Sequence, residues 1–213
     1  ADTLEALAAG ESIGAVVFDP DYVVNGDVAD VVVAAQDGLL TRWTDCTVTP
    51  LATMDPTRRL AQVRAGQTVE LGADPGLADY AALLLAAEQV GAATRALELT
   101  VEYSKERVQF GRPIGSFQAL KHRMADLYVK VQTAGAVVDE ALEDPSPVSA
   151  ALALVTATEA FRDVASEAVQ IHGGIAITAE HDIQLYFKRA HGSAQLLGQP
   201  IEHLRRLESE ALA

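Results

Sequence analysis

Apolar and polar residues follow two different periodicities, and the change lies near residue 75. From residue 77 to 108, the segment "LADYAALLLAAEQVGAATRALELTVEYSKERV" is rich in Ala and Leu and is apolar around most of its circumference. This pattern predicts a helix at the centre of a bundle. The same periodicity predicts further helices at 117–142, 150–172, 180–197 and 200–212. Because long helices with short connections pack against their neighbours, we expect an antiparallel four-helix bundle.

The first part of the chain has the pattern of short strands. Runs rich in Val and Thr are separated by Asp-Pro, Asn-Gly and Asp-Gly, which are turn signals. The runs are residues 13–19, 22–26, 29–38, 39–51 and 59–71. They predict a small antiparallel sheet or barrel. The expected fold class is therefore α+β, with a small antiparallel β domain at 1–75 followed by a four-helix bundle domain at 76–213.

Composition and charge exclude several classes of protein. The chain has 213 residues, a formal net charge of −14 and a pI near 4.6, which argues against general nucleic-acid binding. A single cysteine, Cys46, excludes an internal disulfide framework and is expected to be a small core residue. No apolar run is long enough for a transmembrane helix, and the first residues lack the basic start of a signal peptide. We therefore expect a cytoplasmic protein.

A cationic segment, "ERVQFGRPIGSFQALKHR" (106–123), stands out in this acidic chain. Arg107 ends one predicted helix, Ser116 can cap the next, and Gln118 lies in that helix's first turn. An arginine, an amide and a helix N-terminus can together bind a phosphate or pyrophosphate. On these residues alone, a helical hairpin with solvated charges is the more common explanation.

A second motif is "QIHGGIAI" (170–177). Adjacent glycines after a helix allow a left-handed turn and the close approach of a ligand. Alone, this signal is weak, because a glycine after a helix is usually only a cap.

The two motifs together resemble the C-terminal domain of acyl-CoA dehydrogenases. Arg-x-x-Phe-Gly-x-x-Ile-x-x-x-Gln lies in one hairpin and Gln-Ile-His-Gly-Gly follows about fifty residues later, and the resemblance covers 77–213 with a weaker trace over 13–75. It implies FAD as the cofactor, bound between the middle and C-terminal domains of one subunit with its ADP half held by the neighbouring subunit. The implied contacts, all made in trans, are Arg107, Val108, Gln109 and Phe110 near the pyrophosphate, Phe117 and Gln118 beside them, and Gln170, Ile171, His172, Gly173 and Gly174 on the other side of the ADP moiety.

The chain departs from the family pattern in its first part. Nothing corresponds to the family's N-terminal helical domain. The Gly-rich loop and the Thr-Asn strand that grip the flavin ring are also missing, because "VVFDP" (16–20) leads directly into "YVVNGDVADVVVAA". We therefore expect this chain to lack a complete flavin-ring pocket of its own.

The catalytic base of the family is missing at both of its usual positions. One position, 23 residues after the second glycine of the Gly-Gly pair, is Leu197, and the other, near the start of the first bundle helix, aligns with Ala81. Neither side chain can accept the proton that the reaction removes from the acyl-CoA. Asp79 and Glu88 remain as fallback candidates, although structural roles are the more common explanation. The histidines show no convincing metal spacing, so no metal site is expected.

These features resemble the small subunits of α2β2 acyl-CoA dehydrogenases of actinobacterial steroid degradation. The resemblance implies that a catalytic partner subunit supplies the base, the ring pocket and the cleft for a steroid-derived acyl-CoA, while this chain completes the partner's FAD site. Two alternatives remain open: a self-sufficient homo-oligomer that uses an unusual carboxylate, and a flavin-free structural relative.

Overall fold

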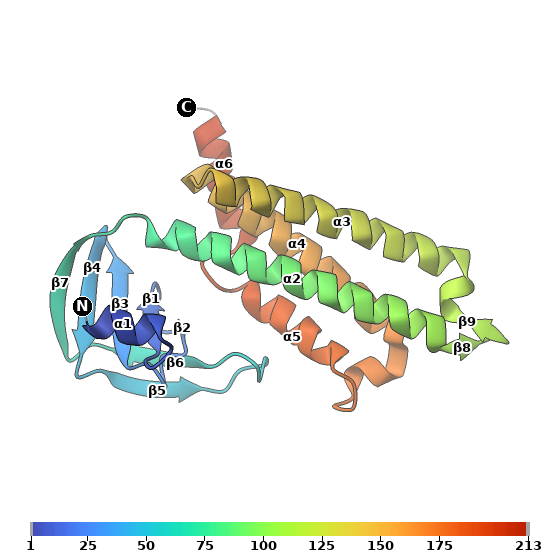
Figure 1. The fold of residues 1–213 in the computed structure, drawn as a ribbon, viewed down its shortest axis with the longest axis horizontal. Coiled ribbons are helices and arrows are strands. Elements are labelled where there is room, and N and C mark those ends of the chain that lie inside the picture. The colour runs from blue at the N-terminus through green and yellow to red at the C-terminus, as the bar shows by residue number, and fades with distance from the viewer. Residues whose placement is uncertain (1, 212–213) are drawn as a thin grey trace. The chain divides into compact units, whose positions relative to one another are not determined.

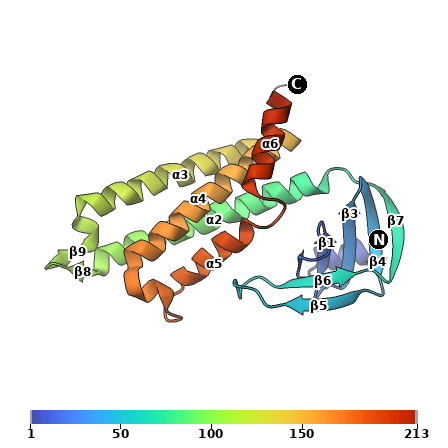
Figure 2. The ribbon, with the colours of Figure 1, turned by 180° about the vertical axis from the view of Figure 1, so that it is seen from behind.

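The computed structural model describes residues 2–211, and these residues form two compact units. The first unit spans Ala1–Ala78 and the second Asp79–Ala213. Each unit has its own hydrophobic core and is described separately (Figure 1, Figure 2). Among the described residues, no helix is long and apolar enough to cross a membrane. The division at 1–75 and 76–213 stays a prediction.

The first unit contains a short helix and two small sheets. After α1 (Asp2–Ala8), which the sequence did not predict, the strands are β1 (Gly14–Val17), β2 (Val23–Val24), β3 (Val31–Gln36), β4 (Leu39–Thr44), β5 (Thr47–Leu51), β6 (Leu60–Arg64) and β7 (Gln67–Ala73). One sheet has the order β1-β3-β4-β7 and the other β2-β6-β5. The expected Asp-Gly turn joins β3 to β4, where Asp37 and Gly38 both have positive φ.

One pairing in this unit differs from the all-antiparallel expectation. β1 pairs with β3 in parallel, with Ala15 opposite Val32. The chain does not turn back directly after β1 but crosses to the other sheet, where it forms β2. It then re-enters the first sheet as β3, parallel to β1. Alternate residues of β1, β3 and β6 are buried, because successive side chains of a strand face opposite sides.

The second unit is the predicted helical bundle. Its elements are α2 (Leu77–Glu106), the small hairpin β8 (Val108–Gln109) and β9 (Arg112–Pro113), the 3-10 helix η1 (Ile114–Ser116), α3 (Gln118–Glu143), α4 (Pro147–His172), the 3-10 helix η2 (Gly173–Ile177), α5 (Ile183–Ser193) and α6 (Pro200–Ala211). The helix predicted at 180–197 is shorter than expected. Residues after Ser193 form a turn in which Leu197 and Gly198 have φ of 59° and 98°, values that end a helix.

Small side chains let the helices of the bundle pack closely. Alanines from α2 and α4 supply much of the core, and Phe161 of α4 is fully buried. Pairs of side chains also join the helices: Gln89 of α2 donates to Thr158 of α4 at 3.0 Å, and Arg123 of α3 pairs with Glu167 of α4. α2 runs the length of this unit, from the end near α6 to the β8–β9 hairpin (Figure 1).

Candidate functional site

The residues predicted to contact flavin come together at one end of the bundle. Two connections meet there: the β8–β9 hairpin with η1, between α2 and α3, and η2, between α4 and α5 (Figure 1, Figure 2). Ile114, Phe117 and Ala176 from these connections pack in the same core cluster as Ile171 at the end of α4. The structure thus unites the two motifs, which are about fifty residues apart in the sequence.

The β8–β9 hairpin presents an arginine and an aromatic ring to solvent. The carbonyl oxygen of Arg107 accepts the backbone N–H of Ile114 at 2.8 Å, and its side chain is exposed. Phe110 is 92% exposed and has a φ of 54°, which is uncommon for a bulky residue. Phe110 lies edge-on to Phe117, and the guanidinium of Arg112 lies 4.0 Å from the centre of the Phe117 ring. Sequence reasoning missed this cation–π contact.

The N-terminus of α3 lies directly after this hairpin. Phe117 stands at the N-cap position, and no side chain among the described residues caps the helix there. The expected cap, Ser116, instead donates its hydroxyl hydrogen to the carbonyl oxygen of Pro113 at 2.7 Å, because it lies within η1. Gln118 is exposed and its amide lies 3.0 Å from the Nε2 of His122. The exposed Val108 and Gln109 complete this segment.

The Gly-Gly turn ends α4 on the other side of the site. Gly173 has a φ of 63°, and its N–H donates to the carbonyl oxygen of Val169, which caps the helix. A Cβ added at Gly173 or Gly174 would meet no atom within 4 Å, so this backbone is open to an approaching group. Gln170 is exposed beside it, whereas Ile171 is buried in the core.

His172 is buried below this turn and does not reach its surface. Only 4% of the residue is exposed, and Nδ1 lies 2.7 Å from the carbonyl oxygen of Ala168. Its ring stacks on that of Tyr103 with centroids 4.2 Å apart, and His181 lies beside both. Burial lowers the pKa of His172, and the nearby His181 lowers that pKa further. Sequence reasoning missed Tyr103 and His181; the one signal was that Tyr103 lies one helical turn before Arg107.

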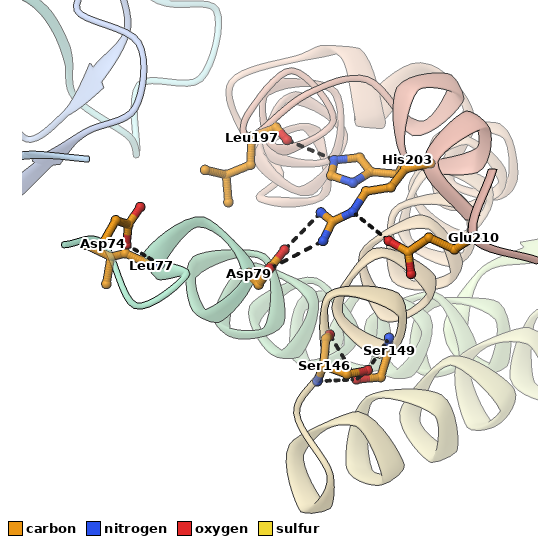
Figure 3. Close-up of polar contacts among 9 residues, drawn as sticks. Asp74, Leu77, Asp79, Ser146, Ser149, Leu197, His203 and Glu210 are labelled. Carbon is orange, nitrogen blue, oxygen red and sulfur yellow. Dashed lines mark hydrogen bonds and ion pairs between the residues drawn. The ribbon is translucent and has the colours of Figure 1, made fainter. Parts of the chain in front are cut away.

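The two usual base positions lie toward the opposite end of α2. Ala81 is the fifth residue of α2, and Leu197 packs against the core cluster that contains Ala82 and Leu83. Figure 3 shows Asp79, Leu197, His203 and Glu210 gathered there. The carbonyl oxygen of Leu197 lies 2.8 Å from the Nε2 of His203. An aliphatic side chain occupies both positions, so neither supplies a base.

The two fallback carboxylates are both in ion pairs. Asp79 accepts from the guanidinium of Arg206 in α6 at 2.9 Å, and hydrogen bonding to Asp79 raises the pKa of that arginine. Glu88 accepts from Arg189 in α5 at 2.9 Å. Each ion pair joins two helices and so gives its carboxylate a structural role. Among residues 2–211, no cluster of three or more His, Cys, Asp or Glu could hold a metal ion.

Comparison with known proteins identifies the family. Residues 56–205 match the family "Acyl-CoA dehydrogenase, C-terminal domain". A protein named acyl-CoA dehydrogenase IpdE2, from Mycolicibacterium smegmatis, is 68% identical over 98% of this chain and 67% of its own length. The chain spans about two thirds of the length of the curated relatives of that name.

Two solved structures share the fold. The ChsE4-ChsE5 complex from Mycobacterium tuberculosis has a TM-score of 0.80 and 29% identity, over 94% of this chain and 63% of that one. The Tcur3481-Tcur3483 steroid ACAD, a G363A variant, has a TM-score of 0.80 and 27% identity, over 93% of this chain and 62% of that one. These matches agree with the β-then-helical order of the elements. The chain therefore belongs to the acyl-CoA dehydrogenase family and contains its C-terminal helical domain.

Proposed function

We propose that this chain is a subunit of a heteromeric, FAD-dependent acyl-CoA dehydrogenase. In this proposal the chain completes the FAD site of a catalytic partner in an α2β2 assembly and does not supply the base itself. The partner's cleft holds the acyl-CoA substrate, which undergoes α,β-dehydrogenation. The cytoplasmic location expected from the sequence also remains a prediction.

The main support for this proposal is that the bundle has no carboxylate at the two usual base positions, while the two fallback candidates are in ion pairs. Leu197 and Ala81 stand where the family's base is expected, and Asp79 and Glu88 are each held by an arginine. A general base must be free to reach the proton that it removes, within hydrogen-bond distance of the substrate. In this proposal none of the four residues acts as the base, because two have no carboxylate and two are held in ion pairs between helices.

The exposed end of the bundle fits the phosphates and ring of a dinucleotide. The proposed ligand groups are the guanidinium of Arg107, the amide of Gln118 and the free N–H groups at the start of α3, which suit an anion. The open backbone of Gly173 and Gly174 admits a close approach, and the exposed Phe110 offers a flat apolar face. Members of this family are FAD-dependent flavoproteins, and when bound the flavin supplies the acceptor for the substrate's hydride.

The comparisons support a partner subunit and a steroid-derived substrate. One structural relative is a complex of two different chains, and another is described as a steroid ACAD with two components. Both exceed 25% identity and cover more than nine tenths of this chain. By this likeness we infer that the acyl group is steroid-derived.

Co-expression with the partner tests the assembly. The chain would be produced alone and together with the product of the adjacent gene, and flavin absorbance would be measured after purification. We expect little flavin on the chain alone and two flavins per four-chain assembly. Stoichiometric flavin with turnover on the isolated chain would refute the proposal, and a flavin-free but intact complex would favour a purely structural role.

Arg107→Ala tests the trans contact directly. In the complex, loss of a charge-assisted bond of about 1.5–3 kcal/mol should weaken FAD binding by roughly 10- to 150-fold. The matched control is Arg95→Ala on α2, because Arg95 is exposed and pairs only with Glu98 among the described residues. Unchanged FAD affinity in Arg107→Ala would remove this residue from the site.

Asp79→Asn and Glu88→Gln separate this proposal from the self-sufficient alternative. Since both carboxylates have structural partners, we expect the turnover of the complex to stay within about twofold. If either change abolished turnover in a homo-oligomer of this chain, an unusual carboxylate base would be the correct explanation.

A further inference from the structure

Tyr103 joins the two segments of the candidate flavin site. It lies one turn before Arg107 in α2, and its carbonyl oxygen accepts the backbone N–H of Arg107 at 2.9 Å. Its side chain contacts a different segment, because its ring stacks on the imidazole of His172. One residue thus contacts both the turn that carries Arg107 and the end of α4 that precedes Gly173.

The hydroxyl of Tyr103 also satisfies a polar group at the end of α4. It donates to the carbonyl oxygen of His172 at 3.3 Å. Such a carbonyl, in the last turn of a helix, has no partner within the helix. The next residue, Gly173, has a positive φ, and no atom lies within 4 Å of where its Cβ would be. The hydrogen bond and the ring stack of Tyr103 therefore hold the backbone at the start of the Gly-Gly turn.

The hydrogen bond to Ala168 fixes which nitrogen of His172 carries the proton in the neutral ring. Because the carbonyl oxygen of Ala168 can only accept, Nδ1 carries the proton, and Nε2 is then the unprotonated atom. Nε2 is buried and has no hydrogen-bond partner among the described residues. The titratable groups that face the ring are Tyr103 from α2 and His181 from the segment before α5. Neither is a carboxylate, so a proton added at Nε2 would create a buried charge without an acceptor.

We propose that Tyr103 is a positioning residue of the flavin site, and that it holds the Gly173–Gly174 turn through its contacts with the ring and the carbonyl oxygen of the buried His172. This inference rests on the proposed function for its link to flavin, but the packing that it describes belongs to this chain alone. The proposal adds Tyr103 and His172 to the site. Their side chains lie under the ligand-facing surface and support the backbone conformation of the Gly-Gly turn.

The pH dependence follows from the direction of the His172 shift. Its pKa in the folded protein lies below the usual 6.5, so the folded chain binds this proton less readily than the unfolded chain does. The contribution of His172 to stability is therefore complete above about pH 6.5 and is lost as pH falls through the lower pKa of the folded protein. The Gly-Gly turn should open in the same acid range.

Hydrogen exchange on the full chain, without flavin or partner, tests this packing. After correction for intrinsic exchange, the amides of residues 173–178 should progressively lose protection as the pH falls below about 6.5. Tyr103→Phe keeps the ring and removes one hydrogen bond, so these amides should exchange about fivefold faster at neutral pH. The matched control is Tyr128→Phe on α3, which alters an exposed hydroxyl. Equal exchange in Tyr103→Phe and Tyr128→Phe would overturn the proposal.

His172→Asn provides a variant that cannot be protonated. The amide nitrogen of Asn lies where Nδ1 lies in His172 and can still donate to the carbonyl oxygen of Ala168, so the acid-dependent loss of protection at 173–178 should disappear, whereas His191→Asn should keep it. Persistence of the acid response in His172→Asn would contradict the role of this ring. If that variant did not fold, the ring of His172 would be titrated in the unchanged chain. It should titrate below the ordinary histidine pKa of about 6.5, and titration at or above that value would overturn the proposal.

The complex with the partner separates this inference from the proposed function. Tyr103→Phe should speed flavin loss severalfold, and wild-type flavin loss should accelerate in acid, with both effects absent in Tyr128→Phe. A complex that never holds flavin would refute the proposed function while leaving the exchange result standing. A loosened turn with unchanged flavin retention would instead refute the positioning role alone.

Discussion

At the scale of single residues, η1 can pack closely against α2 because Gly115 has no side chain. A Cβ added to Gly115 would lie 2.6 Å from the Oγ of Ser104 and 3.0 Å from the carbonyl oxygen of the same residue. The hydroxyl can rotate away, but the carbonyl belongs to the helix backbone and cannot. The close approach lets the connection that carries the candidate flavin contacts lie directly on the end of α2.

Gly115→Ala should therefore destabilise the helical unit. Overpacking against a backbone atom costs roughly 1–3 kcal/mol, measured as the free energy of unfolding in urea from the helical circular dichroism signal. The matched control is Gly91→Ala, because a Cβ at this exposed position in α2 meets no atom within 4 Å. That change should stabilise by about 0.5–1 kcal/mol, since Gly is a poor helix former. Equal effects of the two substitutions would contradict the close packing at Gly115.

Leu197 shows a different residue-scale feature at the other end of the bundle. Its φ of 59° is an outlier for a bulky residue, and the bond to its carbonyl oxygen from His203 helps to hold it. Such strain persists only where the surroundings impose it, and it gathers at functional sites. The backbone at the usual base position thus keeps an uncommon geometry although its side chain is aliphatic.

At the scale of elements, α4 begins with reciprocal hydrogen bonds. The hydroxyl of Ser146 accepts the N–H of Ser149 at 3.0 Å, and the hydroxyl of Ser149 accepts the N–H of Ser146 at 2.8 Å (Figure 3). Pro147 follows at the first helical position, where its missing N–H costs nothing. This capping box starts the helix that ends at the Gly-Gly turn.

Ser146→Ala should remove the hydrogen bond that the Ser146 hydroxyl accepts from the Ser149 N–H, and leave that N–H without its cap. We expect a loss of about 1 kcal/mol in the free energy of unfolding. Ser166→Ala, on the exposed face of the same helix, makes the same chemical change away from the cap, and it should shift stability by no more than about 0.5 kcal/mol. Urea unfolding of the two variants side by side measures this difference, and a smaller loss for Ser146→Ala than for Ser166→Ala would contradict the cap.

Helices were the part of the fold that the sequence predicted best. The periodicity around Leu77 and the proline beside Ser146 are local signals, so the starts of α2 and α4 followed within a few residues. The parallel pairing of β1 with β3 was not predicted, because it depends on where β2 leaves one sheet for the other. Strand pairing is a long-range choice that local propensity does not settle.

The candidate site was only partly visible in the sequence for the same reason. Arg107 and Gln118 stand out as polar residues in a turn, and both are exposed where a ligand can reach them. The contacts below them are made by residues far apart in the chain, such as Tyr103 with His172 and Asp79 with Arg206. No spacing rule connects such pairs, so burial of His172 and pairing of Asp79 required the structure.

At the scale of the whole molecule, the helical unit has two ends with different chemistry. One end exposes Arg107, Phe110 and Gln118 around an open glycine turn. The other end is closed by Leu197 and by the ion pair of Asp79 with Arg206. In the proposed assembly, the first end contacts the partner's flavin, and the second has lost its catalytic role.

Leu197→Glu tests that loss by returning a carboxylate to the usual base position. We expect no added turnover in the purified complex, because a base acts only within hydrogen-bond reach of a bound substrate, and the sequence predicts that this chain lacks a complete flavin-ring pocket of its own. The matched control is Leu197→Gln, which has nearly the same shape without the acid. Turnover per flavin should agree within about twofold between the two variants. A rise in turnover for Leu197→Glu alone, with extra flavin bound, would mean that this end of the bundle still forms an active site of its own.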